Sequence, residues 1–303
     1  MTTEAFYGAR LRERVYDDVI VSPHLDDAVY SLAGRILAAR AAGRKVLVVT
    51  VFGHGKAAAP HGKGRFDDYE AREREDREAM EALDADYVWL NEPELIFRSF
   101  FSAETARSIL PFATFVGTKA FDSARRAITC AVERFAAPEA TVHFPLAIGA
   151  HPDHRIVFEV GWQLSTLHDV RFYEDVPYAL FPSFVTQRLS HLAGLRGPAL
   201  VPTARDTAAF AFRGLGRLLS FLPLLLYVAL VEVLFRIGRR PTDALVPLVP
   251  EELEVSPFVS RKVEAMCLYR SQTPLFFADV SRLEGDLPRS HGVPVERSWR
   301  FAA

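Results

Sequence analysis

The sequence predicts an α/β fold, a mostly parallel sheet with helices on both of its faces. Short apolar runs recur through residues 1–178, segments with helical periodicity separate them, and each connection is long enough for a parallel crossover. The first two runs lie at 19–21 and 45–52 and are rich in β-branched residues. Continuous apolar runs of this length suit strands that are covered on both faces.

The segment between these two strands, 28–43, is the first expected helix. Val29, Leu32 and Ile36 recur at helical spacing, and Gly43 is a suitable residue to end the helix. A strand, a helix and a second strand in this order form a β-α-β unit. Such a unit predicts a parallel, Rossmann-like sheet.

The alternation of helix and strand continues to about Tyr173. Residues 65–83 carry dense charge of both signs, which predicts a solvent-exposed helix. Apolar runs predict three further strands, and helical periodicity predicts two further helices. The strands are expected at 86–90, 140–146 and 170–173, and the helices at 124–135 and 154–167.

After Tyr178 this rhythm stops. We expect one domain made of residues 1–178 and 255–303, interrupted by an insertion at 179–254. Within the insertion, 218–235 is almost wholly apolar and forms an expected helical segment with arginines on both sides. A last helix is expected at 261–272, and the polar tail beyond Asp279 is expected to be loop.

The apolar segment 218–235 has three interpretations that stay open. It falls short of the ~20 residues of a spanning helix and contains Pro223 and Glu232. A single crossing would also separate 261–272 from the domain on which it should pack. We therefore expect a hairpin or flap that contacts a membrane surface peripherally, caps the site, or forms a homo-oligomer contact.

Composition and charge narrow the class of protein. A net charge of −2 leaves no basic field, so no nucleic-acid partner is expected. Cys130 and Cys267 form no CxxC pair, which fits a reducing compartment and excludes a cysteine metal site. The acidic residues Asp17 and Asp18 follow the basic stretch 10–14 without a hydrophobic signal region, so we expect a cytoplasmic protein, with membrane contact as the open alternative.

Two polar motifs follow the first and the fourth expected strands. They are "SPHLDD" at 22–27 and "GAHPDHR" at 149–155. The carboxyl ends of parallel strands lie at one edge of a sheet, where ligands bind, so these loops should lie close together. Their donor groups suit zinc. The three imidazoles and three carboxylates are His24, His151, His154, Asp26, Asp27 and Asp153.

Spacing divides these residues into roles. His24 and Asp27 are three residues apart, so both can turn to one side as the chain enters a helix, whereas Asp26 points elsewhere. His151 and His154 have the same spacing, and either can complete the site. Three protein ligands leave a position open for water and substrate, and a free carboxylate can take the proton of that water. This donor set is that of a metal-dependent amide hydrolase.

The pair "SPHLDD" and "HPDH" resembles the LmbE-like superfamily, also called the PIG-L type N-acetylglucosaminyl deacetylases. Four further fragments match in order, and the resemblance spans about 18–178 and 255–272. The fragments are "GRILAARAAGRKVLVVTVF", "RERED", "FYEDVPYA" and "KVEAMCLYRSQ".

The resemblance implies a role for each motif residue. His24, Asp27 and His154 would hold one Zn²⁺ per chain, and Fe²⁺ suits the same ligands. Asp26 would be the general base. His151 would stabilise the intermediate or protonate the amine, with Asp153 orienting it.

The resemblance also implies an arginine that contacts the substrate near the charged helix. Arg72 and Arg74 both match, and the choice between them stays open. Leu25 and Ala28 depart from the proline and glutamate that the superfamily most often carries at these positions. The metal ligands are untouched by this departure, but the type of substrate is put in doubt.

The implied activity is hydrolysis of an N-acyl group, most simply an acetyl group, from a small-molecule amino sugar or glycoconjugate. Two alternatives share the site: an amidase for a thiol conjugate or natural-product intermediate, and a membrane-associated deacetylase of a lipid-linked sugar. A non-enzymatic sugar-binding module is disfavoured, because a binding protein has no use for a free base beside a metal.

Overall fold

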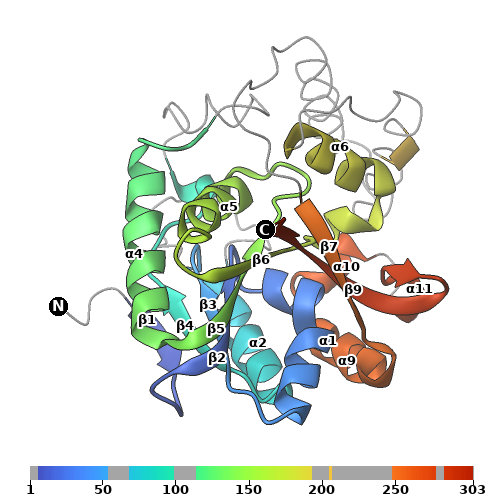
Figure 1. The fold of residues 1–303 in the computed structure, drawn as a ribbon. Helices are drawn as coiled ribbons and strands as arrows, with labels where there is room; N and C mark the ends of the chain where they lie inside the picture. The colour runs from blue at the N-terminus through green and yellow to red at the C-terminus, as the bar shows by residue number, and fades with distance from the viewer. Residues whose placement is uncertain are drawn as a thin grey trace.

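The computed structural model describes residues 6–53, 68–98, 114–192, 205–206, 248–277 and 283–302. Its centre is a mixed sheet covered by helices on both faces (Figure 1). The strands follow the order β1-β4-β3-β2-β5-β6-β9-β7, with β8 paired to β9. The predicted α/β fold is confirmed.

Five parallel strands form the middle of the sheet, as the apolar runs predicted. These strands are apolar along their length because the described helices cover both of their faces. In sheet order they are β4 (Asp86–Leu90), β3 (Val46–Thr50), β2 (Tyr16–Ser22), β5 (Ala136–Pro145) and β6 (Asp169–Tyr173).

Antiparallel strands complete both edges. β1 (Phe6–Arg10) pairs with β4, and β9 (Val293–Phe301) pairs with β6 on one side and β7 (Leu248–Glu254) on the other. The short β8 (Arg289–Ser290) forms a hairpin with β9. The prediction of loop beyond Asp279 is therefore wrong, because half-exposed strands such as β9 carry no continuous apolar run.

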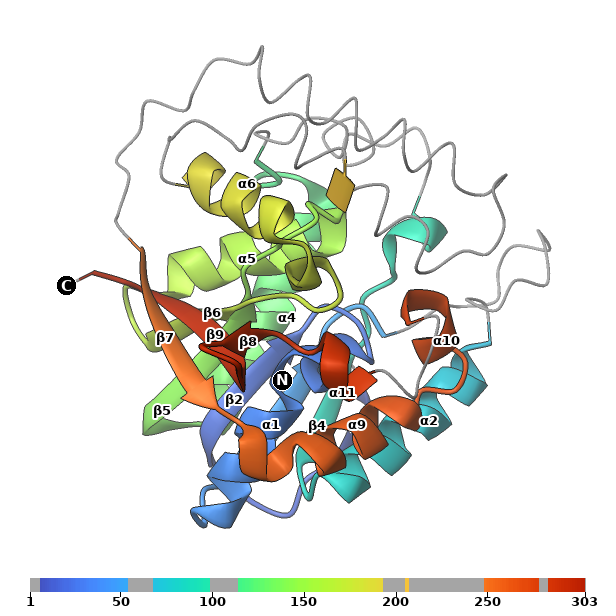
Figure 2. The same cartoon turned by 90° about the vertical axis from the view of Figure 1, so that its right-hand side faces the viewer.

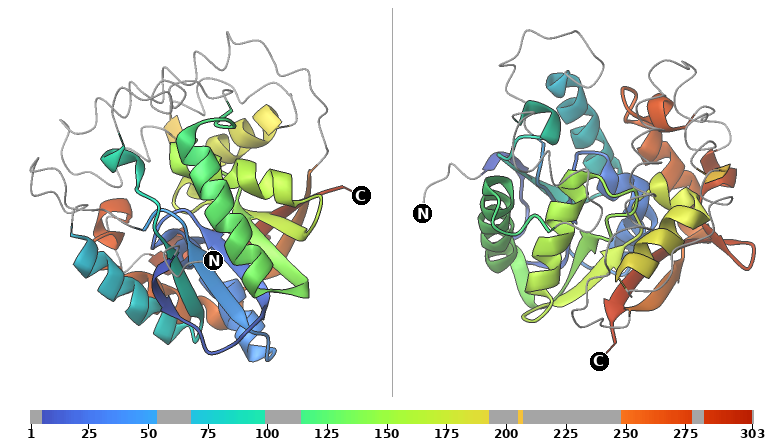
Figure 3. Two further views of the ribbon diagram at one scale, coloured as in Figure 1. Left: turned by 90° about the vertical axis from the view of Figure 1, so that its left-hand side faces the viewer. Right: turned by 90° about the horizontal axis from the view of Figure 1, so that it is seen from above.

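The two faces of the sheet carry different helices. The helices α4 (Lys119–Phe135) and α5 (Pro152–Leu164) cover one face (Figure 3, left). The opposite face carries α1 (Asp27–Ala41), α2 (Tyr69–Ala82) and α9 (Val259–Cys267). On that face α2 and α9 lie side by side, although they come from distant parts of the chain (Figure 2).

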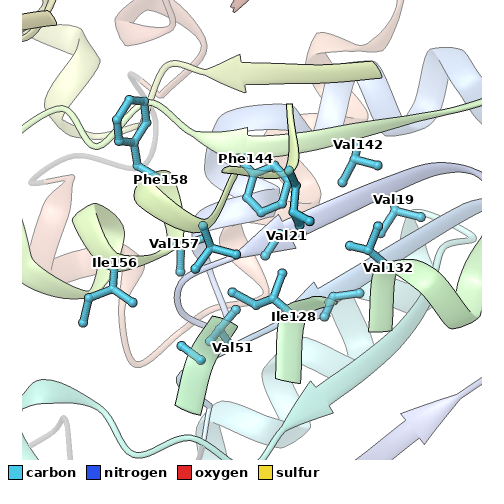
Figure 4. Packing of buried hydrophobic residues seen from close by; sticks show 14 of the residues in the cluster. Val19, Val21, Val51, Ile128, Val132, Val142, Phe144, Ile156, Val157 and Phe158 are labelled. Carbon is cyan, nitrogen blue, oxygen red and sulfur yellow. The ribbon is translucent and has the colours of Figure 1, made fainter. Parts of the chain in front are cut away.

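The apolar layer between the sheet and α4 and α5 fixes the position of the second motif. Val19 and Val21 of β2 face the same layer as Phe144 of β5 (Figure 4). Ile20 between them belongs to the core on the opposite face, with α1. Burial of each such side chain stabilises the fold by about 1.5–3 kcal/mol. At Gly161 of α5 an added Cβ would overlap the Phe144 ring, so the helix lies close to the strand.

Six further elements complete the described structure. They are η2 (Leu95–Phe97), η3 (Tyr178–Leu180), α6 (Pro182–Leu192), η4 (Ser256–Phe258), α10 (Thr273–Phe276) and α11 (Leu283–Asp286). The predicted apolar segment 218–235 lies outside the described residues, and the predicted division into domain and insertion stays a prediction. Within the described ranges, no helix is long and apolar enough to cross a membrane.

Candidate active site

The first motif forms a tight turn between β2 and α1. Ser22, the last residue of β2, donates a hydrogen bond from Oγ to the carbonyl of His24 at 2.6 Å. The same Oγ accepts from the amide of Ala28, at 3.0 Å, in the first turn of α1. Asp26 occupies the N-cap position, and Asp27 begins the helix, where the helix dipole favours its negative charge.

The second motif lies beside the first, because β5 is the parallel neighbour of β2. The turn between β5 and α5 has positive φ angles at Ala147, Gly149 and Ala150, of 62°, 80° and 60°. His151 then caps α5, since its Nδ1 accepts from the Asp153 amide at 3.3 Å. This turn aims the first residues of α5 back toward the first motif.

The three motif histidines form a group that could hold a metal ion. One donor atom from each of His24, His151 and His154 lies within 4.8 Å of the others. Asp27 lies among them: its Oδ2 is 3.1 Å from His24 Nδ1 and 3.1 Å from His154 Nε2. Two ligands of a tetrahedral zinc are separated by about 3.3 Å. The donor set of His24, Asp27 and His154 therefore fits a metal of this kind.

A second carboxylate lies on the far nitrogen of two of these histidines. His24 Nε2 is 3.1 Å from Asp153 Oδ2, and His154 Nδ1 is 2.6 Å from Asp175 Oδ1. Asp175 is itself held by the amide of Ile148, at 3.0 Å. Such outer carboxylates fix the orientation of metal-binding imidazoles and raise their basicity. Asp175 was not among the predicted site residues, although it lies in "FYEDVPYA", a fragment that resembles the superfamily.

Asp153 has contacts that differ from those expected. It was expected to orient His151, but its carboxylate contacts His24, forms an ion pair with Arg98 and accepts from the Leu95 amide at 3.1 Å. Only its backbone amide contacts His151. Arg98 also lies over the Phe52 ring, with Cζ 5.0 Å from the ring centroid. No motif pointed to Arg98, because it is brought to the site by the short helix η2.

Asp26 is buried beside the histidine group. Its side chain makes no capping hydrogen bond to α1. Burial and the neighbouring charge of Asp27 raise the pKa of Asp26 to about 6, although the positive charge of Arg72 partly opposes this shift. A carboxylate with a pKa near neutrality can both take up and give back a proton under ordinary conditions, as a general base must.

The structure separates the two arginine candidates on α2. Arg72 is only 3 % exposed and forms an ion pair with Glu94 at 2.8 Å. Its positive charge acts on Asp26, because it lowers the pKa of that carboxyl against the larger effects of burial and of Asp27. Arg74 lies on the exposed side of the same helix. Geometry therefore brings Arg72, and not Arg74, toward the motif residues.

The pKa values of His154 and His151 are shifted in opposite directions. Burial lowers the pKa of His154, but the charge of Asp27 and the hydrogen bond to Asp175 outweigh it and raise this pKa to about 9. Burial and repulsion by His24 lower the pKa of His151 well below its usual value. Protons on His154 and His24 thus balance the Asp27 charge, and a divalent cation can take their place. The Asp27 charge opposes this lowering of the His151 pKa only in part.

Comparisons with known proteins agree with this fold. Residues 19–165 match the family described as GlcNAc-PI de-N-acetylase, PIG-L, so the predicted resemblance is confirmed over that range. The comparison with curated proteins gave no match.

Among solved structures, the A40926 pseudoaglycone deacetylase Dbv21 is 21% identical, with a TM-score of 0.61 over 96% of this chain and 100% of that chain. The zinc-inhibited form of teicoplanin deacetylase Orf2 is 20% identical, with a TM-score of 0.61 over 93% and 96%. A deacetylase-teicoplanin complex is 22% identical, with a TM-score of 0.58 over the same shares. At these identities the likeness shows a common fold.

Proposed function

Because residues 19–165 form a region of the PIG-L (LmbE-like) family, we propose that this chain is a metal-dependent amide hydrolase. Its substrate would be the N-acyl group, most simply acetyl, of an amino sugar or glycoconjugate. One observation carries the proposal: Asp27 Oδ2 lies 3.1 Å from both His24 and His154, and the buried Asp26 adjoins it in sequence without a capping bond. The family description and the deacetylases of the same fold support it.

The metal would be held by His24 Nδ1, Asp27 Oδ2 and His154 Nε2, with Asp153 and Asp175 behind the two imidazoles. We propose one Zn²⁺ per chain, and Fe²⁺ fits the same nitrogen and oxygen donors. When bound, such a metal supplies Lewis-acid polarisation of the acyl carbonyl and eases deprotonation of water.

Proton transfer would be the task of Asp26 and His151. An Asp26 oxygen takes a proton from the attacking water and returns it to the amide nitrogen as the C–N bond breaks, which yields a free amine and a carboxylic acid. His151 accepts the Asp153 amide at Nδ1, so in its neutral form the hydrogen lies on Nε2. That Nε2–H can donate to the oxyanion or to the leaving nitrogen.

Arg72 is the proposed substrate contact, because of the two candidates it alone is directed toward the motif residues. Its ion pair with Glu94 would orient the guanidinium. We further propose that the protein works in the cytoplasm, as its cysteine usage suggests. The proposed membrane or oligomer contact of 218–235 concerns residues outside those described here.

A second candidate substrate is a glycosylated natural product. The observation that favours it is the near-complete overlap with the A40926 pseudoaglycone deacetylase, which covers 96% of this chain and 100% of that one. Such a substrate would use the same metal, base and imidazole and would differ only in the pocket around them. The two candidates are therefore separated by substrate preference and not by mechanism.

Release of free amine from a panel of N-acyl compounds tests the proposal. The panel holds N-acetyl amino sugars, lipid-linked sugars, thiol conjugates and acylated glycosylated natural products, each incubated with the zinc-loaded protein. We expect an amine from at least one class, loss of that signal on chelation, and recovery when zinc is restored. A signal that survives complete metal removal would contradict a metal-dependent reaction.

A further inference from the structure

Tyr269 is a buried tyrosine that touches the first motif from the far end of the chain. It follows α9 and is 0% exposed. Its hydroxyl oxygen lies 2.9 Å from the carbonyl oxygen of Leu25 and 2.6 Å from Asp76 Oδ1 on α2. Leu25 directly precedes Asp26, so this hydroxyl holds the peptide that carries the proposed base.

The number of available hydrogens decides which of the two short contacts of Tyr269 are hydrogen bonds. A tyrosine hydroxyl has one hydrogen and can donate it to only one acceptor, whereas an ionised carboxylate only accepts. Both short contacts of Tyr269 are hydrogen bonds only if Asp76 carries a proton and donates it to the tyrosine oxygen. The other carboxyl oxygen of Asp76 accepts from Trp89 Nε1 at 2.7 Å. The hydrogen bonds then run in one direction, from Trp89 through Asp76 and Tyr269 to the Leu25 carbonyl.

We propose that Tyr269 is a positioning residue for the reaction, and that a protonated Asp76 directs its hydroxyl onto the Leu25 carbonyl. The chain of bonds fastens the Asp26 peptide to α2, to β4 through Trp89, and to the segment after α9. The inference rests on the proposed function in one respect, the role of Asp26. The protonation of Asp76 stands independently of it.

The charged and titratable groups around Asp76 favour its neutral form. Burial raises the pKa of Asp76 to about 7, and the hydrogen bonds that Tyr269 and Trp89 would donate to the ionised carboxylate only partly oppose this. The Asp26 charge raises this pKa further, whereas Arg72 on the same helix lowers it. Two other groups pack nearby. They are Tyr7 of β1, whose hydroxyl bonds the Gly53 carbonyl, and Glu75, whose carboxylate bonds Ser271.

The variant Asp76→Asn tests the proton directly, because an amide resembles a neutral carboxylic acid. Its NH₂ group can donate to Tyr269 while its oxygen accepts from Trp89. Asp76 has a raised pKa in the folded protein, so its contribution to stability is present below its unfolded pKa near 3.9 and is lost as the pH rises to about 7. We expect the stability of the native chain to fall over this range relative to that of Asp76→Asn.

Activity provides the second readout. Below pH 7 we expect Asp76→Asn to keep kcat within about twofold of the native value. Above pH 7 we expect deprotonation of Asp76 to lower kcat in the native enzyme, and this fall should be absent from the variant. Tyr269→Phe should lower kcat roughly tenfold while KM and metal content stay unchanged. Tyr30→Phe is the matched control, because it removes another buried hydroxyl, bonded to Thr273, without touching the Leu25 carbonyl.

Opposite results would overturn the proposal. If Asp76 is ionised between about pH 4 and pH 7, Asp76→Asn loses a charge-assisted bond and is destabilised throughout that range, or fails to fold. Parallel stability profiles for the two proteins would refute the protonated form equally. Equal kcat losses in Tyr269→Phe and Tyr30→Phe would refute the positioning role. The stability comparison needs no substrate, so it remains decisive even if no tested N-acyl compound is hydrolysed.

Discussion

Asp27 has a special place at the residue scale, because one of its oxygens contacts two imidazoles. Each of these imidazoles has a further carboxylate on its other nitrogen. The result is an alternating series of acids and histidines: Asp153, His24, Asp27, His154 and Asp175. One divalent cation carries the same charge as the protons on the two imidazoles, and carboxylates behind metal-binding imidazoles are common in metal sites, so the series supports the proposed metal site.

The contact between Asp175 and His154 gives a prediction at this scale. Asp175→Asn keeps the shape of the side chain but removes the charge that raises the basicity of His154, so metal affinity should fall about 10- to 100-fold. Competition with a chelator measures the change. Asp169→Asn is the control, since Asp169 is exposed and lies at the opposite end of β6. Equal metal affinity in the native protein and Asp175→Asn would refute the supporting role.

The sequence predicted the motif residues better than it predicted the residues that hold them in position. The six motif residues gather at one end of the sheet because their loops follow adjacent parallel strands, which sequence pattern can anticipate. Asp175 and Arg98 have no local pattern, since only the packing of β6 and η2 brings them near. Asp153 was found, but its partner was not foreseen: whether its carboxylate contacts His24 or His151 depends on the turn before α5.

At the scale of elements, the strands that the sequence predicts are the buried ones, and the strands that it does not predict are half-buried. The strands β2 to β6 are covered on both faces, so each leaves an apolar run in the sequence. In contrast, β7 reads "LVPEELE" and is only half-buried, and β1 and β9 carry similar mixed patterns. Edge strands of this kind take their place through pairing with a neighbour, which a single sequence does not display.

The close approach of α5 to β5 gives a prediction for these elements. Gly161→Ala would place a Cβ against the Phe144 ring, and overpacking of this kind costs about 1–3 kcal/mol. We expect chemical denaturation to show this loss. Since α5 carries His154 at its start, metal affinity should also weaken. Gly285→Ala is the control, because its Cβ would meet nothing within 4 Å and should leave both quantities unchanged.

At the scale of the whole molecule, α9 and β9, which come late in the sequence, support α1. This helix begins with Asp27, the last residue of the first motif. Lys262 of α9 pairs with Glu296 of β9 at 2.6 Å, and both side chains are buried. Glu296 also accepts the backbone amides of Gly34 and Arg35 in α1, at 2.8 and 2.7 Å. Segments from both ends of the chain thus meet at α1, the helix that begins with Asp27.

Removal of one partner from this buried pair tests the connection. Lys262→Met leaves the Glu296 charge buried without its cation, which should lower the free energy of unfolding by about 3–5 kcal/mol. Arg270→Met, which breaks the exposed pair of Arg270 with Glu78, should cost at most about 1 kcal/mol. Similar losses in the two variants would show that the buried pair does not tie the last segments to α1.

In the proposed site, the motif residues separate metal binding from proton transfer. Amine release by Asp26→Ala, measured at the same metal content as the native enzyme on the best substrate of the panel, tests it most directly. We expect one bound metal ion per chain together with a rate lowered about 10²- to 10⁴-fold. Undiminished amine release, or loss of the metal along with the activity, would contradict the assignment of Asp26 as a free base beside the metal ligands.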